Sequence, residues 1–197
     1  MRDKENIEAL SVLKPDFIGF IFHEKSSRNI TEPLAINLPD SISKVGVFVN
    51  KSIEFISDKA DQFNLNYIQL HGNESPEFCK KLKKQLNIGV IKAFNISDDF
   101  KFNNLEPYEP FCDYFLFDAF GKQAGGNGIT FNWTLLEQYT EETPFLLSGG
   151  INETMADNIK QFQHQKCIGI DINSGFEISP AMKNINKIKV FKNELYS

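Results

Sequence analysis

Short apolar runs rich in β-branched and aromatic residues recur along the chain at intervals of roughly 22 to 30 residues. Each run is almost continuously apolar, which is typical of parallel strands that are buried on both faces of a sheet. The pattern predicts seven strands, over residues 16–22, 44–50, 67–71, 89–94, 114–118, 144–148 and 167–173.

Between these runs, apolar residues follow the three- and four-residue spacing of amphipathic helices. The predicted helix faces are Ile53, Ile56, Ala60 and Phe63; Phe78, Leu82 and Leu86; Met155, Ile159 and Phe162; and Ile185, Ile188 and Phe191. Ser75 before Pro76 is a helix start signal, and Asp3 is the expected N-cap of a helix over residues 4–10. Strands that alternate with helices indicate βαβ units in one α/β domain over residues 1–197.

Two architectures fit this alternation. A doubly wound sheet would show a glycine-rich turn after its first strand, and this chain has none there. Its glycine pairs follow the sixth and seventh runs, where a (β/α)8 TIM barrel often binds phosphate. The barrel is therefore favoured. A barrel needs eight strands, and because the sequence opens directly into a helix, we expect an N-terminally truncated barrel in which seven parallel strands remain.

The composition argues against several classes of partner. The chain is 41% hydrophobic and 24% charged with a net charge of −5, and no run of Lys or Arg indicates a nucleic-acid partner. No apolar stretch approaches the ~20 residues that span a bilayer, and the charged start is not a signal peptide. We therefore expect no membrane partner and a cytoplasmic location. Cys79, Cys112 and Cys167 are widely spaced, which favours reduced thiols over disulfides or a metal site.

Two glycine-containing turns near the C-terminus predict a phosphate site. Gly149 and Gly150 end the sixth run, where backbone N–H groups can approach an anion, although a plain tight turn explains them equally well. The turn after the seventh run, with Ser174 and Gly175, tips the balance. Two such turns on neighbouring strands could hold one phosphate, so we expect a phosphate-bearing small molecule as the partner.

Several other side chains are candidates for catalysis or binding, and each of them could instead have a purely structural role. Asp118 ends a strand on the expected catalytic face, and the glycine-rich segment 121–128 after it could be a lid. Arg28 suits a carboxylate but could be an exposed loop residue. His71 could face the barrel mouth or make only structural hydrogen bonds. Lys92 is a candidate for an inward-facing charge, without an assigned role.

Taken in order, these motifs resemble the phosphoribosylanthranilate isomerase family of (β/α)8 enzymes. The matching segments are residues 1–3, 19–22 with 27–28, 44–48, 69–72, 117–118, 125–128, 147–151 and 171–177. The resemblance implies the Amadori rearrangement of N-(5-phosphoribosyl)anthranilate to 1-(2-carboxyphenylamino)-1-deoxyribulose 5-phosphate in tryptophan biosynthesis. It also implies that no cofactor or metal is needed. A different phosphosugar barrel enzyme has less support from the segments 69–72 and 173–177.

The resemblance implies a role for each matching residue. Asp118 would be the general acid that opens the furanose ring, which requires a pKa above its ordinary value of ~4. Arg28 would hold the anthranilate carboxylate, and His71 would line the pocket. The phosphate would be held by backbone N–H groups around four residues, Gly149, Gly150, Ser174 and Gly175.

One departure from the family pattern concerns the general base. In the family a Cys-Gly pair precedes the Met-Arg-Asp motif, and that Cys is the base, whereas this sequence begins at the Met. Cys79, Cys112 and Cys167 are expected in a helix or at the opposite ends of strands. We therefore expect the chain as given to be impaired or inactive. A mis-assigned start is favoured over a deliberate truncation or a natural, non-catalytic phosphosugar binder, and a homo-oligomer could cover the open barrel edge.

Overall fold

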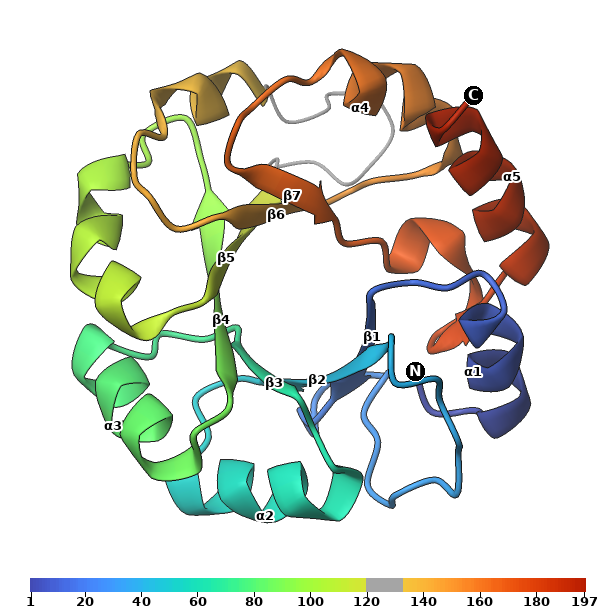
Figure 1. Cartoon of the computed structure of the whole chain (residues 1–197), viewed down its shortest axis with the longest axis horizontal. Coiled ribbons are helices and arrows are strands. Elements are labelled where there is room, and N and C mark those ends of the chain that lie inside the picture. Colours follow the sequence, from blue (N-terminus) through green and yellow to red (C-terminus); the bar gives the residue numbers. More distant parts are fainter. Residues whose placement is uncertain (120–132) are drawn as a thin grey trace.

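Seven parallel strands curl into an open barrel in the order β1-β2-β3-β4-β5-β6-β7 (Figure 1). The fold is known from a computed structural model that describes residues 1–119 and 133–197. The strands are β1 (Phe17–Ile21), β2 (Ser43–Phe48), β3 (Tyr67–Leu70), β4 (Gly89–Ile96), β5 (Tyr114–Ala119), β6 (Phe145–Ser148) and β7 (Cys167–Ile170). The predicted seven-stranded parallel α/β architecture is confirmed. Within the described residues, β1 and β7 are not paired with each other.

Helices cover the outside of the strands (Figure 1). The α-helices are α1 (Lys4–Ser11), α2 (Ile53–Phe63), α3 (Pro76–Leu86), α4 (Ala156–Gln161) and α5 (Ile185–Leu195). The carboxylate of Asp3 accepts from Asn6 N–H and the hydroxyl of Ser75 accepts from Phe78 N–H, so both predicted N-caps are confirmed.

Shorter elements complete the chain. They are the 3-10 helices η1 (Phe102–Phe111), η2 (Trp133–Gln138), η3 (Glu153–Met155) and η4 (Ser174–Phe176), and an antiparallel pair, β8 (Glu177–Ser179) with β9 (Met182–Lys183). Pro107 and Pro110 lie inside η1, where each removes a backbone donor that an α-helix would use. The seventh predicted run also ends early, because residues 171–173 form a loop.

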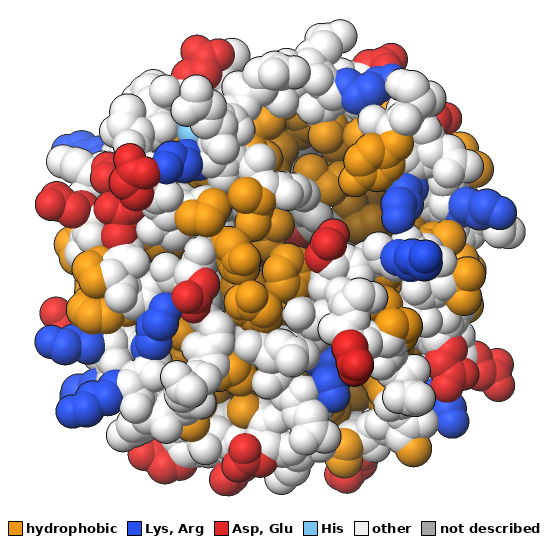
Figure 2. All heavy atoms as spheres, viewed as in Figure 1, with side chains coloured by type: hydrophobic (Ala, Val, Ile, Leu, Met, Phe, Trp, Pro, Cys, Tyr) orange, Lys and Arg blue, Asp and Glu red, His pale blue; other side chains and the backbone are white. Residues whose placement is uncertain are grey.

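Alternate residues of each strand enter two different cores. The inner core contains Val45, Ile91, Ala93, Leu116 and Leu146, and the rings of Phe17, Tyr67 and Tyr114 pack against it. The outer core, between strands and helices, is rich in phenylalanine, and burial of each such ring contributes about 1.5–3 kcal/mol. Apolar side chains gather near the middle of the molecule in Figure 2, inside a rim of charged ones. This alternation decides which polar side chains face the barrel interior.

The expectation that Lys92 faces inward is wrong. Its strand neighbours Ile91 and Ala93 belong to the inner core, so Lys92 points to the outer side of β4. Its ammonium lies 5.1 Å from the centre of the Phe94 ring, which packs against the outer core. The side chain is buried, with only 3% exposed.

A buried asparagine joins the two ends of the described chain. The Asn6 side chain of α1 donates to the carbonyl of Lys183 at 2.8 Å and accepts from the N–H of Lys183 at 2.7 Å. These bonds fix α1 against β9. Figure 1 shows α1 and α5 side by side near the same edge of the barrel, where the two helices are in contact.

Replacing Asn6 by alanine is expected to lower the free energy of unfolding by about 2–3 kcal/mol. The change leaves a buried N–H and a buried carbonyl without partners, and each such group costs ~1–3 kcal/mol. Urea titration followed by circular dichroism measures the loss. Ser11→Ala on the same helix removes only an exposed hydrogen bond to Glu8 and is the control. Equal midpoints for the two variants would contradict the assignment.

Candidate active site

Four polar side chains meet at the C-terminal ends of the parallel strands. His71 follows β3, Asp118 lies in β5, Ser148 ends β6 and Asp171 follows β7. Asp118 and Ser148 are paired in register, and Asp171 N–H donates to the carbonyl of Leu147 at 2.7 Å. Because carboxyl ends of parallel strands share one edge, residues far apart in sequence come together here.

His71 forms the central contact with Asp118. Its Nε2 lies 3.3 Å from Oδ2 of Asp118, and its Nδ1 lies 3.0 Å from Nε2 of Gln69. An amide nitrogen donates hydrogen bonds, so Nδ1 accepts and the ring proton of neutral His71 is on Nε2, directed at the carboxylate. The His71 and Asp118 side chains are 29% and 24% exposed, so a small molecule can reach both. Gln69 thus sets the tautomer that orients the predicted acid.

Asp171 is a second carboxyl group at this edge that the sequence reasoning did not single out. Burial raises the pKa of Asp171, and the nearby charge of Asp118 raises it further, while Lys183 and His71 oppose the shift. The Ser148 hydroxyl lies 3.3 Å from its Oδ2. The position directly after a strand, as for Asp118 at the end of β5, was the available sequence signal.

Asp171→Asn is expected to stabilise the protein at neutral pH, because burial disfavours the ionised form of Asp171. The pKa of Asp171 is higher in the folded protein than its ordinary value of 3.8. Asp171 therefore contributes fully to stability below pH 3.8, and this contribution is lost as the pH rises through the shifted pKa. The neutral amide avoids that loss. Unfolding free energies should therefore diverge from wild type only as pH rises above 3.8.

The exposed Asp157 of α4, which pairs with Lys160, supplies the matched control for this measurement. Asp157→Asn should leave the pH dependence of stability unchanged, because an exposed ion pair contributes little. An Asp171→Asn protein that loses stability at neutral pH would show that the charged carboxylate is needed for the fold.

Arg28 is held by Glu177 of β8. Nε of Arg28 lies 3.0 and 2.9 Å from the two carboxylate oxygens, and Nη2 lies 2.6 Å from Oε2. Lys183 of β9 donates to the same carboxylate at 3.3 Å and to the carbonyl of Asn173 at 3.0 Å. Burial disfavours the charge on Glu177, but Arg28 and Lys183 outweigh it and hold the pKa of that carboxyl below its usual value. This pairing was not foreseen from the sequence.

The two glycine-containing turns lie against each other. Gly149 and Gly150 have positive φ angles of 93° and 66°, which favour glycine. Gly175 of η4 packs so closely on the turn after β6 that a Cβ there would lie 2.2 Å from the carbonyl oxygen of Ile151. Within the described part of the chain, the N–H groups of Gly149, Gly150, Ser174 and Gly175 donate no hydrogen bond. Unused N–H groups in adjoining turns form a suitable anion site.

Other predicted features lie elsewhere. Segment 121–128, the predicted lid, falls outside the described residues. The described residues contain no group of three or more His, Cys, Asp or Glu side chains arranged for a metal ion. None of the described helices is long and apolar enough to cross a membrane.

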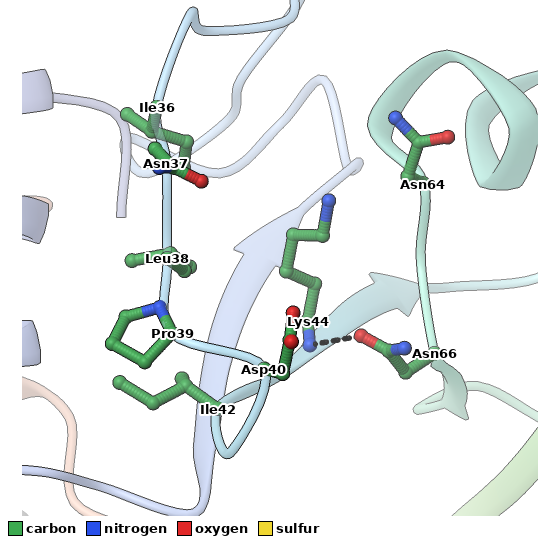
Figure 3. A pocket seen from close by; sticks show the side chains of 9 residues that line it. All are labelled: Ile36, Asn37, Leu38, Pro39, Asp40, Ile42, Lys44, Asn64 and Asn66. Carbon is green, nitrogen blue, oxygen red and sulfur yellow. Dashed lines mark hydrogen bonds between the residues drawn. The ribbon is translucent and has the colours of Figure 1, made fainter.

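A cavity of about 290 Å³ lies at the opposite end of the strands (Figure 3). Its lining includes Lys44, near the start of β2, and Asn66, just before β3, and the N–H of Lys44 donates to Oδ1 of Asn66 at 2.8 Å. It contains none of the predicted site residues, so we attribute no part of the chemistry to it.

A parallel α/β barrel with an imidazole–carboxylate pair and two adjoining turns suited to an anion at the C-terminal ends of its strands is typical of a class of enzymes acting on small phosphorylated molecules. Within that class, the family model for N-(5'phosphoribosyl)anthranilate (PRA) isomerase matches residues 1–194. The chain belongs to this family, which confirms the resemblance seen in the sequence.

Proteins named N-(5'-phosphoribosyl)anthranilate isomerase are similar over almost the whole chain. The one from Phocaeicola vulgatus is 45% identical and covers 99% of this chain and 94% of its own length. The one from Parabacteroides distasonis is 47% identical, with 97% and 88% covered.

Solved structures of the same kind share the fold. Phosphoribosyl anthranilate isomerase from Thermotoga maritima matches with a TM-score of 0.81 and 31% identity, over 100% of this chain and 95% of that one. Another structure of the isomerase contains reduced 1-(o-carboxyphenylamino)-1-deoxyribulose 5-phosphate and matches with a TM-score of 0.80 and 29% identity, over the same shares.

Proposed function

We propose that this protein catalyses the Amadori rearrangement of N-(5'-phosphoribosyl)anthranilate in tryptophan biosynthesis. The observation that carries the proposal is the placement of the His71–Asp118 pair at the same edge of the barrel as four backbone N–H groups that donate to no described residue. The names of the relatives support the same reaction. The proposed partner is a small phosphoribosyl substrate, with no cofactor, metal, nucleic acid or membrane.

The two glycine-containing turns would bind the 5'-phosphate. Four N–H groups from Gly149, Gly150, Ser174 and Gly175 can donate to phosphate oxygens without first breaking bonds to described residues. Hydrogen bonds to a charged acceptor contribute ~1.5–3 kcal/mol each. The phosphate would thereby place the sugar between the ends of β5, β6 and β7.

Arg28 would hold the carboxylate of the anthranilate ring. Glu177 occupies its Nε and Nη2 groups, while Nη1 makes no hydrogen bond to a described residue. The cluster of Arg28, Lys183 and Glu177 carries two positive charges and one negative charge, so it attracts an anion. A carboxylate can approach Nη1 while Glu177 keeps the guanidinium oriented.

Asp118 would protonate the furanose oxygen and open the ring to an iminium ion. His71 lies beside the same carboxyl and would orient it. Removal of the C2 proton requires a base, and the three cysteines do not qualify. Cys79 lies in α3, Cys112 precedes β5 and Cys167 begins β7, so none is at the C-terminal edge. The family pattern implies the Cys of a Cys-Gly pair as this base.

We also propose a cytoplasmic location and a homo-oligomer that covers the gap between β1 and β7, which do not pair with each other within the described residues. One structure of the Thermotoga maritima protein is described as a monomer generated from a dimeric isomerase, which supports oligomers within the family. Sedimentation equilibrium tests this proposal, and a monomer at all concentrations would contradict it.

The proposed function is tested by incubating the protein with N-(5'-phosphoribosyl)anthranilate and following its conversion. Two forms are compared, residues 1–197 and the same chain extended by a strand ending in Cys-Gly. Conversion by either form supports the isomerase, and the extended form should be the faster. Calorimetry with the reduced product analogue separates the alternatives. Binding without conversion by both forms favours a non-catalytic phosphosugar binder, and neither binding nor conversion rejects the proposed function.

A further inference from the structure

A buried ion pair lies on the outer side of the barrel, behind His71. Nζ of Lys92 lies 3.3 Å from Oε2 of Glu74, and the two side chains are 3% and 2% exposed. Glu74 sits in the loop between β3 and α3, and Lys92 sits in β4. No step of the proposed reaction uses either residue, and neither contacts Asp118.

The pair forms hydrogen bonds with the backbone on both sides of His71. Lys92 donates to the carbonyl of Leu70 at 3.2 Å and to the carbonyl of Gly72 at 2.9 Å. Oε2 of Glu74 accepts from Gly72 N–H at 2.9 Å. The peptide groups adjoining His71 are therefore fixed by one ammonium and one carboxylate.

The same carboxylate reaches the neighbouring loop. Oε1 of Glu74 accepts from Asn50 N–H at 2.8 Å, and the side chain of Asn50 accepts from Asn73 N–H at 2.7 Å. A Cβ on Gly72 would come within 2.4 Å of Asn50 and 2.8 Å of Glu74, so only glycine fits between them. The buried carboxylate of Glu74 thus links the loops after β2 and β3.

A buried ion pair contributes little net free energy to folding. Desolvation of two charges often outweighs their attraction, and apolar replacements of similar volume are frequently as stable. Burial lowers the pKa of Lys92, although the charge of Glu74 opposes that shift. The arrangement is explained better by what the charges hold in place than by stability alone.

We propose that Glu74 and Lys92 are positioning residues for the proposed isomerase reaction, acting by fixing the His71 backbone so that Nε2 meets Asp118. The inference rests on the proposed function for its catalytic consequence. His71 needs such support because its strand ends at Leu70 and its side chain is partly exposed. A shift of ~1 Å in a positioning contact can lower a rate by ~100-fold.

The experiment compares wild type with Glu74→Gln, Lys92→Met and the double variant. The double variant removes both charges and avoids leaving one of them buried alone, so it is the informative protein if a single variant unfolds. The control is Lys83→Met with Asp113→Asn, which removes a partly exposed ion pair between α3 and the residue before β5, near the start of β4. Circular dichroism establishes that each protein is folded.

The first readout is the His71 ring in ¹⁵N NMR, which is assignable because the chain has three histidines. Wild type and the control should show the Nε2–H tautomer, and the double variant should show a mixture of the two tautomers. The second readout is kinetic: kcat should fall about tenfold or more while KM changes less than about threefold.

A folded double variant with wild-type His71 signals and wild-type kcat would overturn the positioning role. Altered His71 signals in a protein whose wild type neither binds the reduced product analogue nor converts the substrate, in either chain form, would support the positioning of His71 and reject the proposed function instead. An unfolded double variant beside a folded control would also count against the proposal, because it would make the pair a requirement of the fold.

Discussion

Replacing Asp118 by asparagine is expected to lower kcat by about 10²–10⁴-fold, the range typical of a lost general acid. The amide has nearly the same shape and its oxygen can still accept from Nε2–H of His71. It cannot supply a proton to the furanose oxygen. The measurement is steady-state conversion of N-(5'-phosphoribosyl)anthranilate in the chain form that turns over most rapidly.

Binding separates a lost proton from a damaged pocket. Calorimetry with the reduced product analogue should give a dissociation constant within about threefold of wild type, because the phosphate turns and Arg28 are untouched. Asp157→Asn, on the exposed face of α4, is the control for the substitution itself. Near-wild-type kcat in the Asp118→Asn protein would mean that another group protonates the ring, with Asp171 at the same edge as one alternative carboxyl.

The strands of the barrel could be predicted because each is buried on both faces. Runs such as residues 114–118 are almost continuously apolar, and β5 occupies Tyr114–Ala119. Helix starts were equally local, since the caps of α1 and α3 depend on a side chain and an N–H three residues away. Such short-range signals survive without knowledge of the tertiary structure.

The parts of the site that could not be predicted depend on contacts between residues far apart in the sequence. Arg28 and Glu177 are 149 residues apart, so nothing near Arg28 indicated its partner. The β8–β9 pair that carries Glu177 is too short to give an alternating pattern. Lys92 was assigned to the wrong face because every residue of Val90–Ala93 is buried, and a strand buried on both sides gives no sign of which side is the interior.

The two turns proposed to bind the phosphate could be predicted only in part. Glycines at the ends of β6 and β7 were visible in the sequence, and the order of the strands made them neighbours. The close approach of Gly175 to Ile151 was not visible, because it depends on how η4 packs against the turn after β6. That approach leads to the second large expected effect.

Gly175→Ala is expected to weaken binding of the reduced product analogue by about 10–100-fold. The added Cβ would lie 2.2 Å from the carbonyl oxygen of Ile151 and 3.2 Å from Cα of Asn152, so the backbone of one turn must move. Movement separates the N–H groups that would hold the phosphate, and overpacking also costs about 1–3 kcal/mol of stability. Calorimetry with the analogue and with inorganic phosphate measures the change in affinity.

Gly169 provides the matched control for this variant, and Gly150, within the proposed phosphate site, tests backbone strain without a clash. Gly169→Ala in β7 places its Cβ 3.5 Å from Leu146, an ordinary contact, so affinity should be unchanged. Gly150→Ala meets no atom within 4 Å, but its φ of 66° costs roughly 1–2 kcal/mol for a non-glycine residue. If Gly175→Ala weakens the analogue and inorganic phosphate alike, the lost contacts are those to the phosphate. If it leaves both affinities unchanged while Gly169→Ala does the same, the two turns do not form the phosphate site, and the anion must bind through Arg28 and Lys183 instead.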